Sequence, residues 1–159
     1  MHLSATPEKL WFLDTLVHIH MPSAANADGI NVMEHLTPYG SSPPLHIHHA
    51  EDEIFHVLEG EARFVLDGRE IKVRAGQTLM APKGSRHTFV VTSKTGARWL
   101  TITRGCFERM VRALSHPAER DELPVMAGPP TAERIQALEA ACRDNDLEIV
   151  GPPLSLRTA

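Results

Sequence analysis

Apolar and polar residues alternate over most of the N-terminal two thirds of the chain, in short runs separated by turn-forming residues. The alternation is clearest at residues 62–66 and 69–73, which are joined by Asp67 and Gly68. Asp-Gly between two such runs is a preferred two-residue hairpin turn, because both positions adopt a positive φ there. Residues 62–73 are therefore predicted to form a β-hairpin.

Further runs that are rich in β-branched and aromatic residues predict strands on both sides of this hairpin. Many short strands with regularly spaced turn signals are typical of a sandwich or a barrel. The pattern therefore predicts an all-β domain over residues 1–104. Its other strands are expected at residues 9–13, 15–21, 29–36, 53–59, 87–92 and 98–103.

The hydrophobic period changes in residues 105–159, which are predicted to form a helical extension that packs on the barrel. Residues 106–114 carry a stripe of apolar side chains at helical spacing. A proline-rich connector follows this first helix. The last run, residues 147–154, is expected to be a short extended tail.

A second helix is predicted over residues 132–143. Thr131 precedes it and is expected to be its N-cap, because a threonine hydroxyl can accept a hydrogen bond from the first turn. Ile135, Leu138 and Cys142 are expected to face inward.

His46, His48, Glu53 and His87 form the candidate metal site. His46 and His48 are two positions apart in an extended run, so their side chains point to the same face. Glu53 begins the next predicted strand and His87 begins a later one. Three imidazoles and one carboxylate can hold a divalent transition metal and leave coordination positions open, which is typical of a reactive metal site.

These residues lie in two blocks that resemble the two sequence motifs of the cupin superfamily. Residues 40–60 match the first motif, Gly-x5-His-x-His-x4-Glu-x6-Gly. Residues 76–91 match the second, Gly-x5-Pro-x-Gly-x2-His-x3-Asn, except that Val91 replaces the final Asn. The resemblance implies a double-stranded β-helix, or jelly-roll barrel, with the same four residues as metal ligands. The motif Asn is not a ligand in the family, so Val91 affects a polar contact in the pocket and leaves the metal prediction unchanged.

The segment after the barrel resembles the tail of single-domain bacterial quercetin 2,3-dioxygenase-like cupins. The similarity is carried by residues 107–114, a Pro-Ala-Glu step at residues 117–119, and Leu123-Pro124. It implies a metal-dependent dioxygenase that cleaves a flavonol-type ring with molecular oxygen. In such a mechanism Glu53 would be both a ligand and the general base that takes the substrate proton.

Strand parity also predicts the wall of a substrate pocket. If Glu53 points inward, so do Phe55 and Val57 on the same run, and Phe89 and Val91 follow from His87 in the same way. An apolar wall around a metal suits a small organic substrate. The alternative is that these four apolar residues simply fill the barrel core.

The cofactor expected from these ligands is one divalent transition metal ion. Imidazole and carboxylate suit iron, manganese, nickel, cobalt, copper and zinc, so the sequence does not choose among them. Two alternatives to the dioxygenase stay open: a metal cupin with non-oxidative chemistry, such as an isomerase, lyase or decarboxylase, and a non-catalytic small-molecule binder.

The charge and composition of the chain limit which classes of partner it can bind. The chain has 159 residues and a formal net charge of −4, which argues against nucleic acid as a partner, since phosphate contacts need a basic face. No apolar run approaches the length of a membrane span, and the two cysteines lack metal or disulfide spacing. We therefore expect a cytoplasmic protein with a small-molecule substrate. The resemblance to cupins, which are often dimers, and the edge strands of an open sandwich imply a homodimer.

Two remaining features are interpreted as structural. His18 and His20 form another His-x-His pair, but no glutamate or glycine frame follows it, so a half-exposed strand face is expected. Glu51 lies in the turn between the first motif's histidines and its glutamate, and is expected to be a polar turn residue.

Overall fold

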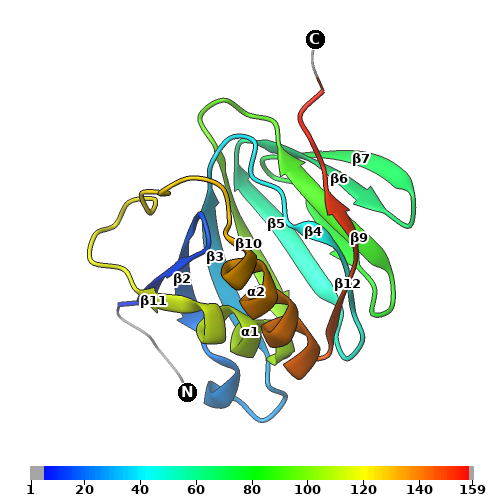
Figure 1. Ribbon diagram of the computed structural model, residues 1–159. Coiled ribbons are helices and arrows are strands. Elements are labelled where there is room, and N and C mark those ends of the chain that lie inside the picture. Colours follow the sequence, from blue (N-terminus) through cyan, green and yellow to red (C-terminus); the bar gives the residue numbers. More distant parts are fainter. Residues whose placement is uncertain (1–5, 158–159) are drawn as a thin grey trace.

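The computed structural model of the protein describes residues 6–157, which form two β-sheets packed against each other and two α-helices on one side of them (Figure 1). The seven strands of the larger sheet in this part of the chain are β1 (Glu8–Phe12), β2 (Thr15–Met21), β3 (Asn31–Thr37), β5 (Glu53–Glu59), β8 (Thr78–Ala81), β10 (Ala97–Thr103) and β11 (Ser115–Pro117). The five of the smaller sheet are β4 (Pro44–His48), β6 (Glu61–Leu66), β7 (Arg69–Arg74), β9 (Arg86–Val91) and β12 (Leu147–Pro153).

The strand order is β11-β1-β2-β3-β10-β5-β8 in the larger sheet and β12-β4-β9-β6-β7 in the smaller one. The pairings are antiparallel, and β4 pairs with β9 although about forty residues separate them in the chain. Such crossovers between two sheets make a jelly roll, so the predicted all-β jelly-roll fold is confirmed.

The predicted hairpin is β6 and β7, and its turn has the expected chemistry. Asp67 has a φ of 47° and Gly68 has a φ of 79°. Both values lie in the left-handed region that a two-residue turn between twisted strands requires.

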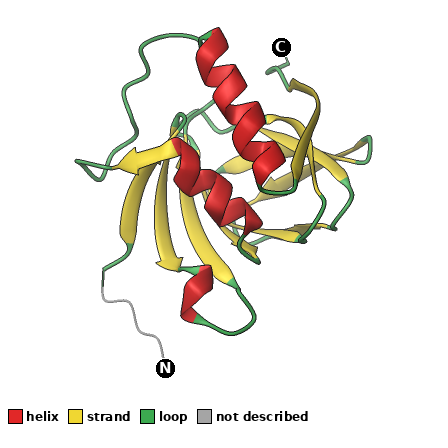
Figure 2. Ribbon diagram, turned by 60° about the horizontal axis from the view of Figure 1, so that its bottom comes forward, coloured by secondary structure: helices red, strands yellow, loops and turns green. Residues whose placement is uncertain are grey.

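The two helices are α1 (Cys106–Leu114) and α2 (Ala132–Asp144), and they lie beside each other against the sheets (Figure 2). Thr131 caps α2 as predicted, because its Oγ1 accepts a hydrogen bond from the Arg134 N–H at 3.3 Å. Cys142 is buried and Leu138 packs against the core. The prediction for Ile135 is wrong: its side chain is 45% exposed, because α2 contacts the core through its C-terminal half.

The C-terminal run is more than a tail, since β12 extends the smaller sheet beside β4. Leu147 pairs with His48 and Ile149 pairs with His46, so this strand covers the edge of the strand that carries both histidines.

The division into residues 1–104 and 105–159 stays a prediction. No helix among residues 6–157 is long and apolar enough to cross a membrane.

The apolar interior has two parts. One lies between the two sheets and is built on Phe55, Phe64 and Trp99. The other lies between the helices and strands β1 to β3, and includes Phe107 and Met33. The His87 ring packs against Phe55 of the first part and the His48 ring against Phe107 of the second, so the candidate metal site lies where the two parts meet.

Candidate metal centre

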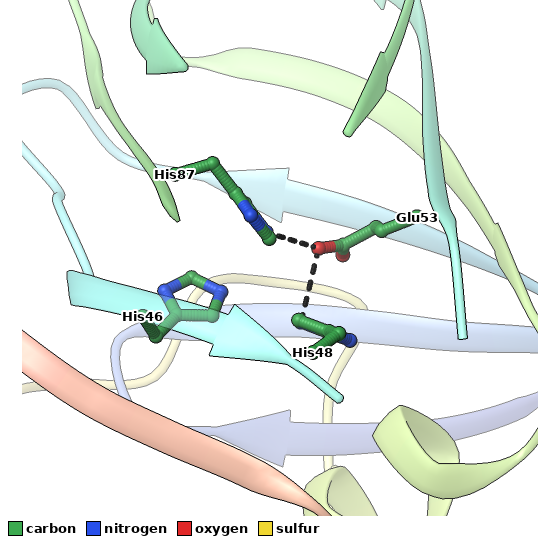
Figure 3. A group of neighbouring side chains, drawn as sticks. All are labelled: His46, His48, Glu53 and His87. Carbon is green, nitrogen blue, oxygen red and sulfur yellow. Dashed lines mark hydrogen bonds and ion pairs between the residues drawn. The ribbon is translucent and has the colours of Figure 1, made fainter. Parts of the chain in front are cut away.

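The two sheets contribute different ligand types to the site. His46 and His48 come from β4, and His87 comes from β9, where it pairs directly opposite His46. Glu53 begins β5 in the other sheet. The three imidazoles therefore face the carboxylate across the barrel, as Figure 3 shows.

The predicted ligand atoms converge. One ligand atom from each of His46, His48, Glu53 and His87 lies within 4.8 Å of every other. Glu53 Oε2 lies 3.0 Å from His87 Nε2 and 3.2 Å from His48 Nε2. The His46 and His87 rings are 4.4 Å apart between centroids. The group is therefore able to bind a single metal ion.

Each ring also has an oxygen acceptor near its other nitrogen. His46 Nδ1 donates to the Pro44 carbonyl at 2.7 Å, and His87 Nδ1 lies 3.3 Å from the Ser85 carbonyl. His48 Nδ1 is 3.6 Å from a carboxylate oxygen of Glu51. A ligating histidine in proteins usually holds its remote N–H in this way, which leaves Nε2 for the metal.

His48 supplies a direct test of whether a metal fits. Its side chain is 1% exposed, and neither ring nitrogen has a hydrogen bond within the described part of the chain. Buried polar atoms are almost always satisfied, so two orphaned imidazole nitrogens require an explanation. A cation at the point where His48 Nε2 and Glu53 meet would satisfy Nε2, and the donor set suits divalent transition metals.

The electrostatics keep the carboxylate charged. Burial opposes ionisation of Glu53, but nearby His48 and His87 outweigh burial and lower its pKa to about 2. Burial, reinforced by His87 and His48, lowers the pKa of His46. An ionised Glu53 and a neutral His46 are the forms in which these two groups bind metal.

Glu51 lies in the turn between β4 and β5 as expected, but the sequence did not predict that it is buried next to the site. Its carboxylate accepts backbone N–H bonds from Arg104 at 2.6 Å, Cys106 at 3.2 Å and Phe107 at 2.5 Å. These N–H groups begin α1, whose N-cap, Gly105, has no side chain to offer.

Glu51 therefore connects α1 to the metal centre through His48. Burial raises the pKa of Glu51, but His48 and the backbone N–H groups outweigh it, so the net pKa is lowered. Burial alone would lower the pKa of His48, yet Glu53 and Glu51 together raise it. The sequence gives no signal for this contact, because its partners lie more than fifty residues away.

The predicted pocket-wall residues are in the barrel interior. Phe55, Val57 and Val91 are 2% exposed or less, and Phe89 is half-buried. Phe55 and Phe89 join Phe64 and Trp99 in an aromatic cluster. Their role toward a substrate stays a prediction.

The position of Val91 explains why this sequence departs from the second motif. Its side chain is fully buried within the apolar core between the sheets. A polar amide there would be surrounded by hydrocarbon, at a cost unless it found a hydrogen bond. Valine fills the position with apolar surface.

Comparisons with known proteins agree with this geometry. Residues 32–103 match the family model described as "Cupin domain". An oxalate-binding protein from Thermotoga maritima is 34% identical over 65 residues, which are 41% of this chain and 54% of that protein. An uncharacterized protein from Methanocaldococcus jannaschii is 33% identical over 57 residues, 36% of this chain and 46% of that one. The chain thus spans about half the length of these curated relatives.

Two solved structures share the fold. One is a predicted oxalate decarboxylase from Thermotoga maritima, with a TM-score of 0.54 and 25% identity, over 65% of this chain and 98% of that one. The other is the polyketide cyclase RemF from Streptomyces resistomycificus, with a TM-score of 0.51 and 25% identity, over 63% and 69%. The match over residues 32–103, the jelly-roll architecture and the four converging ligands agree with the cupin resemblance of the two sequence motifs.

Proposed function

We propose that the protein is a metal-dependent cupin whose ion is held by His46, His48, Glu53 and His87. The ion would be one divalent iron, manganese, nickel, cobalt, copper or zinc. One observation carries the proposal: His46 and His87 hold Nδ1 toward backbone carbonyls and His48 Nδ1 faces the Glu51 carboxylate at 3.6 Å, so each ring presents Nε2 to the centre. A bound ion would supply Lewis acidity and open positions for a ligand's oxygen atoms.

The proposed ligand is a small organic anion with two oxygen donors, of the oxalate class. A divalent ion with one carboxylate ligand leaves a net positive charge, which favours an anion. Close packing of Phe55 and Phe107 against His87 and His48 limits the space on two sides of the centre. His46 is the half-buried ligand, so we place the approach to the centre on its side. The names of the oxalate-binding relative and of the decarboxylase-like structure support the same class.

The chain's residues have separate roles in this proposal. Glu53 carries a negative charge at neutral pH and lies between two imidazoles, so it would serve as the anionic ligand of the ion. Phe55, Val57, Phe89 and Val91 would exclude water from the barrel side of the centre. Whether the ligand reacts or is only bound separates an enzyme from a binding protein.

A flavonol-cleaving dioxygenase is the second candidate. It is favoured by the similarity of residues 107–124 to the tails of quercetinase-like cupins. The tail begins with α1, and the Phe107 ring lies 5.5 Å from the His48 ring, so this segment contributes to the surroundings of the centre. In this candidate Glu53 would take the proton of the flavonol hydroxyl.

The test uses untagged protein loaded with one metal at a time. Oxalate binding is measured by calorimetry, and oxygen uptake is measured with oxalate or a flavonol under air, against an anaerobic control. His46→Ala/His48→Ala should abolish binding, and His49→Ala, an exposed histidine outside the site, should not. Flavonol-dependent oxygen uptake without oxalate binding would favour the second candidate. Ligand binding that survives loss of both histidines would overturn both.

A further inference from the structure

A second group of metal-binding side chains lies on the outer face of the larger sheet. His18 and His20 alternate along β2 with the buried residues Val17 and Ile19, so both imidazoles point away from the core. Glu34 on β3 pairs directly opposite His18. Strand parity and register therefore bring two imidazoles and a carboxylate to one place on the outer face.

The three side chains are close enough to share an ion. One ligand atom from each of His18, His20 and Glu34 lies within 4.8 Å of the others. Glu34 Oε2 is 2.9 Å from His20 Nε2. The two rings are 6.3 Å apart between centroids and nearly perpendicular, at 79°. Two imidazoles on one strand and a carboxylate on the strand opposite can supply three of the four ligands of a tetrahedral site.

Neighbouring side chains hold the candidate ligands in orientation. Glu34 Oε1 accepts a hydrogen bond from the Arg98 guanidinium at 3.1 Å, while Oε2 of the same carboxylate contacts His20. His18 Nε2 lies 2.8 Å from Asp121 Oδ1, which leaves Nδ1 of that ring for a cation. Asp121 is itself held by Lys9 at 2.6 Å. A carboxylate on the remote nitrogen of a ligating histidine is a common feature of protein zinc sites.

We propose that His18, His20 and Glu34 form a second divalent-metal site, of the zinc type, on the outside of the barrel. Water would complete its coordination, because all three ligands are partly exposed. The site is separate from the barrel centre, since it lies on the opposite face of the larger sheet from Glu53. The ion would also fix His18 against Asp121 and so fasten the connector between α1 and α2 to β2.

The chain offers a matched control. His49 Nε2 lies 2.8 Å from Glu148 Oε2 on the surface, the same kind of imidazole–carboxylate contact but outside both metal-ligand groups. If such a contact were sufficient, this pair would bind zinc as well. If a second imidazole is required, this pair does not bind zinc, and replacing His49 leaves the number of bound zinc ions unchanged.

The experiment measures how many zinc ions bind to each chain. Untagged protein is stripped with a chelator and dialysed against zinc, and bound metal is measured for the wild type and for three variants whose folding is checked by circular dichroism. We expect two ions per chain in the wild type and in His49→Gln, and one in His18→Gln/His20→Gln. His46→Ala/His48→Ala should also keep one.

The outcomes separate this proposal from the barrel centre. Two ions in His18→Gln/His20→Gln, or none in His46→Ala/His48→Ala, would overturn the outer site. One ion in the wild type that is lost in His18→Gln/His20→Gln would support the outer site while contradicting the barrel centre. Cobalt(II) in place of zinc gives a second readout, because a tetrahedral site absorbs strongly in the visible range.

Discussion

Replacing Glu51 tests whether the metal centre and the first helix depend on the same carboxylate. Glu51 is 3% exposed and accepts three backbone N–H bonds at the start of α1, while one of its oxygens faces His48. In Glu51→Ala these N–H groups lose their acceptor inside the protein, and His48 loses the group next to its Nδ1.

The expected loss of stability is large. A hydrogen bond to a charged group contributes about 1.5–3 kcal/mol. The three bonds share one acceptor and are not additive, so we expect Glu51→Ala to lower the free energy of unfolding by about 3–5 kcal/mol. Glu51→Gln keeps one acceptor oxygen and the volume, and should lose about half as much. Loss of a group that orients a ligating histidine should weaken metal binding about 10- to 100-fold.

Urea unfolding of metal-stripped protein at neutral pH measures the first effect, and metal titration of the folded variants measures the second. Glu148→Ala is the control, because Glu148 is an exposed carboxylate next to an exposed histidine. Its effect should stay within about 0.5 kcal/mol. If Glu51→Ala has the same free energy of unfolding and the same metal affinity as the wild type, the reasoning is refuted.

Two further predictions concern pH and backbone strain. Burial lowers the pKa of His35 from 6.5 to about 4, so the unfolded chain binds the proton more readily and stability falls as the pH drops below 6.5. Between pH 6.5 and 5 this costs about 1.5 kcal/mol. Over that range, urea unfolding should show a fall in the free energy of unfolding that is smaller in His35→Asn than in the wild type by about this amount; equal pH dependence in both would contradict the assignment. Gly60 has a φ of 79°, and a Cβ there would lie 2.5 Å from the Gly96 carbonyl oxygen, whereas Gly76, at 84°, has open space. Gly60→Ala should therefore cost about 1–3 kcal/mol more than Gly76→Ala in the same assay, and equal losses would show that the close approach is unimportant.

Local patterns predicted the strands and the shared face of His46 and His48, because both depend on short-range rules. Side-chain alternation put His46 and His48 on one face, and the Asp67-Gly68 turn fixed the hairpin register. The cupin motifs then indicated that distant Glu53 joins them. Alternation and turn chemistry are set by the backbone within a few residues, so the sequence displays them directly, whereas the contribution of Glu53 was inferred from the motifs.

Features that depend on distant contacts were not predictable in the same way. Glu51 looks like a turn residue until α1 is placed over it, and Ile135 lies on the apolar stripe of α2 although only the far half of that helix is covered. The C-terminal run forms β12 because the edge of β4 is open to pairing. Each outcome is decided by tertiary packing and not by local pattern.

Anomalous X-ray diffraction from crystals of metal-loaded protein tests the central claim most directly. The account predicts a peak enclosed by His46, His48, Glu53 and His87, about 2.0–2.2 Å from each histidine Nε2 and from a Glu53 oxygen. Density with the four side chains splayed apart, and no anomalous peak between them at saturating metal, would contradict it.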